Sequence, residues 1–115
     1  MNNSPFSMGW LMTMFDLPVM TPDERKVASQ FRKDLLDHGF LMIQFSVYAR
    51  PCVNFEQLKK HISDVQRLVP PAGNVRLLFI TDEQWAKSVT VIGPNYNQGK
   101  RAVAPTVPEQ VEFWE

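Results

Sequence analysis

Residues 40–50 read FLMIQFSVYAR, and this stretch decides the fold. It is too apolar and too rich in aromatic and β-branched residues for a surface loop, so it belongs in a sheet. We expect two short strands, or one bent hairpin, with a break near residues 44–46. The break is needed because the helix that follows must return to the face covered by the helix before it.

Apolar strands are also predicted on both sides of this hairpin. Residues 10–15, WLMTMF, are apolar on both faces, as in a central buried strand that ends at Asp16. Residues 75–81, VRLLFIT, form another core strand. Residues 89–92 are predicted to add a short extra strand.

The first predicted helix begins at a capping box. Thr21 can cap it, Pro22 fits its first position, and Glu24 has the capping-box spacing. It runs to about His38, where Gly39 stops it. Its buried stripe is predicted from helical spacing to contain Val27, Phe31, Leu35 and Leu36.

A second helix is predicted over residues 55–69, with Asn54 as its cap. Its apolar stripe is predicted to be Phe55, Leu58, Ile62, Val65 and Leu68. His38 and His61 lie on the two helices without a second histidine at ligand spacing. Each is interpreted as a solvated or capping residue rather than a base.

The resulting order is β-α-β-β-α-β, an α+β, ferredoxin-like plan with an antiparallel four-stranded sheet and a C-terminal extension strand. Residues 8–93 form the predicted domain, and residues 94–115 a linker and docking tail. Two helices would cover one face of the sheet and leave the other apolar face open. Because apolar faces are normally covered, we expect a second subunit there, and thus a homodimer.

Composition limits the function. The 115 residues carry 12 Lys plus Arg and 12 Asp plus Glu, so the basic excess of many nucleic-acid-binding proteins is absent. Any such role needs a local patch or a partner. Cys52 is the single cysteine and is interpreted as a packing residue, so an intrachain disulfide is excluded. We expect a cytoplasmic protein without a signal peptide or membrane span.

Asp16 is the leading candidate for chemistry, because it ends a buried strand just before a loop and a helix. From spacing alone, capping the next turn ranks ahead of binding a divalent metal. A metal site becomes more plausible when a two-fold axis brings two copies together. On the first helix, Arg25-Lys26 and Arg32-Lys33 alternate with acidic residues, as on an ordinary solvated face, although a subset could contact phosphate.

Four segments, in order and at the right spacing, resemble one family: FDLPV at 15–19, FRKDLLDHGF at 31–40, QFSVYAR at 44–50 and PPAGNVRLLFITDEQW at 70–85. Over about residues 8–93 the chain resembles the CRISPR-associated Cas-two proteins, particularly those of type II systems.

The resemblance implies a ferredoxin-like homodimer with its two sheets packed together. It implies metal-dependent phosphodiesterase activity on RNA or DNA in some members, with Mg²⁺ or Mn²⁺. It also implies a bridge between two dimers of the integrase Cas-one on double-stranded prespacer DNA. Asp16 corresponds to the family's metal-binding and catalytic aspartate, Ser46 to its backbone-binding hairpin, and Arg25 and Lys26 to basic residues of its first helix.

One position departs from the family. Many members carry a second acid two residues after the first, where this chain has Pro18. That weakens a metal site built from one subunit and leaves the bridging role intact. Two alternatives stay open: a metal-dependent nuclease that acts alone, and an RRM-type RNA-binding module. The second is disfavoured because the RNP1 pattern is missing.

The tail is the last candidate site. Val111, Phe113 and Trp114 are costly to leave in water near a terminus, so we expect them to dock. The partner is either the dimer mate, through an edge strand, or the integrase, through an added strand or a groove. The resemblance favours the integrase.

Overall fold

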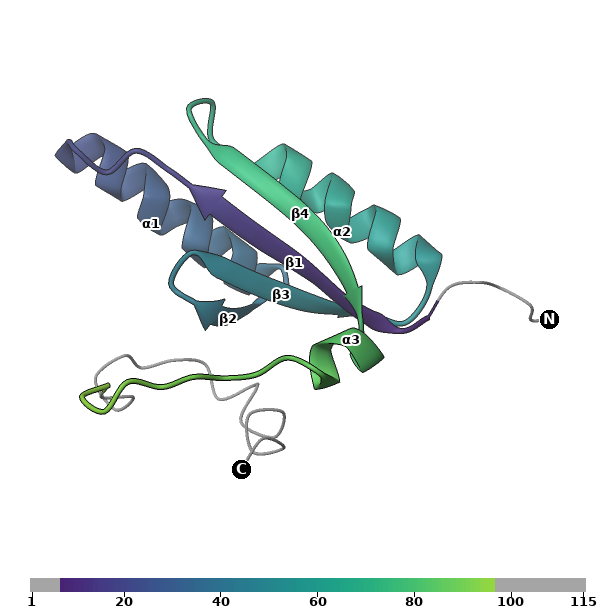
Figure 1. The fold of residues 1–115 in the computed structure, drawn as a ribbon. Coiled ribbons are helices and arrows are strands. Elements are labelled where there is room, and N and C mark those ends of the chain that lie inside the picture. Colours follow the sequence, from purple (N-terminus) through teal and green to yellow (C-terminus); the bar gives the residue numbers. More distant parts are fainter. Residues whose placement is uncertain (1–6, 97–115) are drawn as a thin grey trace.

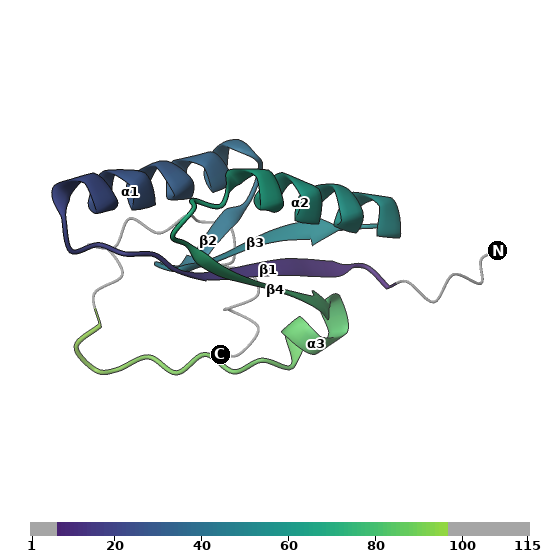
Figure 2. The same cartoon turned by 90° about the horizontal axis from the view of Figure 1, so that it is seen from above.

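The computed structural model describes residues 7–96, which form one antiparallel sheet with two long helices on one face (Figures 1 and 2). The elements follow in the order β1 (Gly9–Asp16), α1 (Pro22–Asp37), β2 (Leu41–Gln44), β3 (Val47–Cys52), α2 (Phe55–Leu68), β4 (Asn74–Thr81) and α3 (Asp82–Ala86). The strands are arranged as β2-β3-β1-β4. The predicted β-α-β-β-α-β order is confirmed.

Strand β1 is central because it pairs with both β3 and β4. Met12, for example, lies between Ala49 and Leu78. Successive side chains of a strand point to opposite faces, so β1 divides its residues between two environments. Leu11 and Phe15 belong to the core under the helices, whereas Trp10 contacts Trp85 of α3.

The core lies between the sheet and the two long helices. The Phe15 ring meets Phe31 of α1 edge-on, at 5.0 Å between ring centroids, and lies 5.6 Å from Tyr48 of β3. Such aromatic pairs add to the stabilisation that comes from burying their area. Cys52 is buried in the same cluster and free, as the prediction of a packing residue requires.

The predicted break in the hairpin is confirmed, because β2 ends at Gln44 and β3 begins at Val47. The turn that enters the hairpin depends on Gly39. Its φ of 86° is left-handed, and a Cβ there would collide with the Arg50 guanidinium. Gly39 therefore both stops α1 and leaves room for Arg50.

The predicted helix stripes are partly wrong. Val27 and Leu36 are about half exposed, and the buried face of α1 is Ala28, Phe31 and Leu35. A helix that lies on a flat sheet buries a narrow face, and Ala28 allows close approach there. In α2, Phe55 is exposed, and the predicted stripe omits two buried polar residues, His61 and Asp64.

The extra strand predicted at residues 89–92 is also wrong. A short helix, α3, precedes these residues and begins at a capping box between Thr81 and Gln84. Val89 and Val91 are exposed and pair with no strand among residues 7–96. Helix α3 lies on the side of the sheet opposite α1 and α2 (Figure 2). Among the described helices, none is long and apolar enough to cross a membrane.

Candidate functional site

The face of the sheet opposite α1 and α2 carries an apolar surface, which we call the open face. By strand alternation and register it consists of Trp10, Met12, Met14, Leu41, Ile43, Val47, Ala49, Leu78 and Ile80, with the exposed Arg76 opposite Met14 toward the Asp16 end. Helix α3 covers one end, where Trp85 lies 6.4 Å from Trp10 between ring centroids. Leu78, near the middle, stays 49% exposed. Within residues 7–96 most of this surface thus has only partial cover.

Asp16 lies at the carboxyl end of β1 and is exposed. It is opposite Asn74 of β4 and belongs to the same alternation as Met12 and Met14, so it borders the open face. In the described part of the chain, no group of three His, Cys, Asp or Glu residues could hold a metal. With Pro18 nearby in place of a second acid, residues 7–96 of one chain supply a single carboxylate here.

Ser46 lies in the β2–β3 turn at the same end of the sheet. Its carbonyl accepts a hydrogen bond of 3.1 Å from the backbone N–H of Phe15, next to Asp16. The turn is therefore fixed against the strand end that carries the carboxylate. The structure brings together two of the predicted site residues, Asp16 and Ser46.

The two predicted basic residues of α1 differ in their contacts. Arg25 donates to the carbonyls of Val19 and Met20, at 3.1 and 3.2 Å, and so closes the loop before the helix. Lys26 is exposed. Neither contacts Asp16 or Ser46 in the interactions of residues 7–96.

Arg32 is one of the cations noted on this helix but is not among the predicted site residues. Its Nε donates to the Phe45 carbonyl at 3.3 Å, and its guanidinium carbon lies 3.9 Å from the centroid of the Phe45 ring. It is also 5.6 Å from the Phe15 ring. The only sequence signal was its place in a mixed-charge helix, which does not distinguish it from its neighbours.

A partly buried polar contact joins the two helices to β3 at the other end of α1. Arg50 donates from Nε to His61 Nε2 at 2.9 Å, and from Nη1 to the His38 carbonyl. His61 is buried, which corrects its interpretation as a solvated or capping residue. Burial, and then the Arg50 charge, lower the pKa of His61, although Asp64 opposes them.

Asp64 is held by cations on its own helix. Lys60 is 3.0 Å away, and Arg67 also bonds to the carboxylate, which is almost fully buried. Burial raises the pKa of Asp64, but the bonds to Lys60 and Arg67 outweigh it and leave the pKa below its ordinary value. These three side chains stabilise α2 and supply no free acid or base.

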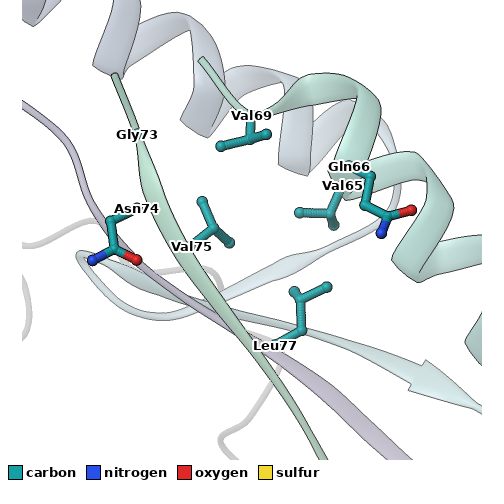
Figure 3. A pocket seen from close by; sticks show the side chains of 7 residues that line it. All are labelled: Val65, Gln66, Val69, Gly73, Asn74, Val75 and Leu77. Carbon is teal, nitrogen blue, oxygen red and sulfur yellow. The ribbon is translucent and has the colours of Figure 1, made fainter. Parts of the chain in front are cut away.

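An open hollow of about 350 Å³ lies between α2 and β4 (Figure 3). Its lining is mostly apolar and contains Val65, Gln66, Val69, Gly73, Asn74, Val75 and Leu77. None of these side chains is titratable. The hollow therefore lacks the groups for acid–base or metal chemistry, and the sheet end at Asp16 remains the candidate site.

We predict that folding stability falls as the pH drops below about 6.5, the ordinary pKa of histidine, because of His61. The folded state favours the neutral form of the His61 ring. Below about pH 6.5 the unfolded chain therefore binds more protons than the folded chain. Neutral His61 stabilises the fold fully above about pH 6.5, and this stabilisation is lost as the pH falls through the lower pKa of the folded state. The resulting change in the free energy of unfolding is at most about 1.4 kcal/mol per pH unit.

Urea unfolding between pH 5 and 8 measures this effect. His61→Gln should flatten the slope. Equal slopes for the wild type and His61→Gln would show that His61 does not titrate in this way.

Comparisons with known proteins agree with this architecture. The family model described as CRISPR associated protein Cas2 matches residues 8–88. The chain is 40% identical over 105 residues to the CRISPR-associated endoribonuclease Cas2 of Parvibaculum lavamentivorans, which covers 91% of this chain and 99% of that protein. The protein of the same name from Paracidovorax avenae is 38% identical and covers 95% and 96%.

The crystal structure of Streptococcus pyogenes Cas2 superposes with a TM-score of 0.55 at 19% identity, over 73% of this chain and 99% of that one. At this identity the superposition supports the fold alone. The family model and the two relatives carry the assignment, since they span most of the chain. The chain belongs to the CRISPR-associated protein Cas2 family.

Proposed function

We propose that this protein is a homodimeric adaptor of spacer acquisition, which bridges two dimers of the integrase Cas-one (Cas1) and contacts double-stranded prespacer DNA. The observation that carries the proposal is the open face, an apolar surface on one side of a sheet whose other side is covered by helices. We further propose the type II affiliation, on the strength of the four sequence segments.

Dimerisation through the open face follows from its composition. Specific interfaces bury roughly 1,200–2,000 Å² in total, and their centres are apolar and poor in charge. On the open face Leu78 and Met12 lie side by side in the register, with Ala49 opposite Met12. Along β4, Ile80 and Arg76 flank Leu78 on the same face. A two-fold axis through this surface would pair the two sheets.

The same symmetry bears on Asp16. Because Asp16 borders the open face, sheet-to-sheet pairing would bring the two carboxylates toward each other. Two carboxylates with water could hold Mg²⁺ or Mn²⁺, which take oxygen ligands. A bound ion would polarise a phosphoryl oxygen or activate water for phosphodiester hydrolysis. We propose Asp16 as the metal ligand and catalytic residue of any such activity.

We expect Asp16→Asn to abolish any cleavage of RNA or DNA, because an amide is a much weaker metal ligand than a carboxylate. Asp16 is exposed, so the fold and the dimer should stay intact. The measurement is release of fragments from labelled single-stranded RNA and duplex DNA in the presence of Mg²⁺ or Mn²⁺.

Asp23→Asn, at an exposed acid in the first turn of α1, is the matched control and should retain wild-type cleavage. Cleavage by chelator-treated protein at the untreated rate would contradict the metal role. Absence of cleavage by every form of the protein would favour the adaptor over a nuclease that acts alone.

The tail belongs to the same proposal. Val111, Phe113 and Trp114 lie outside the described residues, so their docking on the integrase stays a prediction from sequence. The RRM-type alternative is less favoured by the geometry. RRM domains stack bases on aromatic side chains of the sheet, whereas here the Trp10 ring is next to Trp85 of the same chain.

A further inference from the structure

The cations of α1 differ in what they already bind. Arg25 donates hydrogen bonds to the carbonyls of Val19 and Met20, and Lys33 pairs with Asp37 at 3.4 Å. Arg32 makes no ion pair within residues 7–96, and its single hydrogen bond there uses Nε. Both Nη groups of Arg32 therefore remain available, and its charge is not neutralised by a carboxylate.

Arg32 is held in place by two contacts with Phe45. The guanidinium lies over the Phe45 ring at 3.9 Å, while the Phe45 carbonyl fixes Nε. Stacking on an aromatic face orients a guanidinium and leaves its charge without a carboxylate partner. A guanidinium held in this way loses little conformational entropy when it binds a ligand.

The support under Arg32 is itself anchored. The turn that carries Phe45 is tied to β1 by the hydrogen bond from the Phe15 N–H to the Ser46 carbonyl. Phe45 is 55% exposed, so the stacked pair is at the surface. Arg32 is itself partly exposed, at the end of the sheet where Asp16 also lies.

We propose that Arg32 binds a backbone phosphate of duplex DNA, and that Phe45 holds its guanidinium for this contact. The planar fork of arginine matches two phosphate oxygens, and a contact to phosphate positions DNA without reading its sequence. The inference rests on the proposed DNA-contacting function and names a residue for it. It makes Arg32, rather than Arg25, the phosphate-binding arginine of α1.

The test is fluorescence anisotropy of a labelled duplex of about 30 bp with the full-length protein, across a series of salt concentrations that exposes phosphate contacts. Arg32→Gln should weaken binding about tenfold, the loss expected for one charge-assisted hydrogen-bonded contact. It should also lower the salt slope by about one per contacting protomer. Lys33→Gln, which removes one charge from the adjacent position, should change both quantities much less.

Two further variants separate binding from folding. Arg32→Lys keeps the charge, so the salt slope should hold while affinity falls, because lysine lacks the fork. Phe45→Ala should weaken binding in the wild type and add little in the Arg32→Gln background. A purely structural role of Arg32 would lower the thermal unfolding temperature and leave the salt slope unchanged.

The proposal is overturned if Arg32→Gln binds like Lys33→Gln, if Arg32→Lys binds as tightly as the wild type, or if Phe45→Ala has the same effect in both backgrounds. If the wild type binds duplex DNA in any of those cases, the proposed adaptor function is not contradicted. Failure of the wild type to bind duplex DNA, alone and with the integrase, would remove both.

Discussion

Leu78→Glu should convert the protein from a dimer to a monomer. Leu78 is near the middle of the open face and next to Met12 in the register, so a carboxylate there would be buried when two sheets pack. An uncompensated buried charge costs roughly 3–5 kcal/mol, and a symmetric interface would contain two such charges, one from each subunit. The dimer should weaken by at least about 10⁴-fold, since each 1.4 kcal/mol is a factor of about ten.

Leu36→Glu is the matched control for this experiment. Leu36 is 48% exposed and Leu78 is 49% exposed, but Leu36 is on the outer side of α1. Sedimentation at micromolar concentration should give twice the chain mass for the wild type and Leu36→Glu, and the chain mass for Leu78→Glu. A dimeric Leu78→Glu variant would mean that the interface lies elsewhere. A monomeric wild type would mean that the protein forms no stable dimer.

Gly9→Ala should destabilise the fold more than other small substitutions. A Cβ on Gly9 would lie 2.1 Å from the Ile80 carbonyl oxygen and 2.8 Å from Thr81 Cα, both in the backbone of β4. Side-chain rotation cannot relieve contacts with backbone, so β1 and β4 must separate at this end. The cost should equal or exceed the roughly 1–3 kcal/mol of an overpacked core.

Gly93→Ala provides the comparison, because a Cβ at Gly93 meets no atom within 4 Å. Urea unfolding of both variants should show a large loss of stability for Gly9→Ala and a change within about 0.5 kcal/mol for Gly93→Ala, as is usual at open surface sites. Equal stabilities would mean that β1 and β4 are not held as closely as the structure has them.

Local signals made most of the fold predictable from sequence. The capping box at Thr21 and the positive φ required of Gly39 define α1, and the change of pattern after Gln44 separates β2 from β3. These features depend on residues close in sequence, so their chemistry is visible without the tertiary structure. They suffice to give the β-α-β-β-α-β order.

The errors came from features that depend on distant contacts. His61 is buried because Arg50, eleven positions earlier on β3, reaches it across the sheet–helix interface. Residues 89–92 have the composition of a strand but no partner strand among the described residues. Helix α3 was missed because its capping box continues directly from β4, with no loop to mark the boundary.

The candidate site was predictable in the same limited sense. Asp16 was indicated by its place at the end of a buried strand, and its metal-binding role and Ser46 came from the family resemblance. The structure brings the two residues to one end of the sheet. Arg32 could not be distinguished from Arg25 or Lys33 by sequence, because all three are cations on one helix. Only their contacts in the structure show which of these cations already binds protein groups and which has donors left for a ligand.

The most direct test of the adaptor function is integration of a labelled prespacer duplex into a repeat-containing plasmid by the purified integrase, with and without this protein. We predict that integration requires the protein, continues with Asp16→Asn and Leu36→Glu, and is lost with Leu78→Glu. Integration at the same rate without the protein, or with Leu78→Glu in its monomeric form, would contradict the claim that a homodimer built on the open face bridges the integrase.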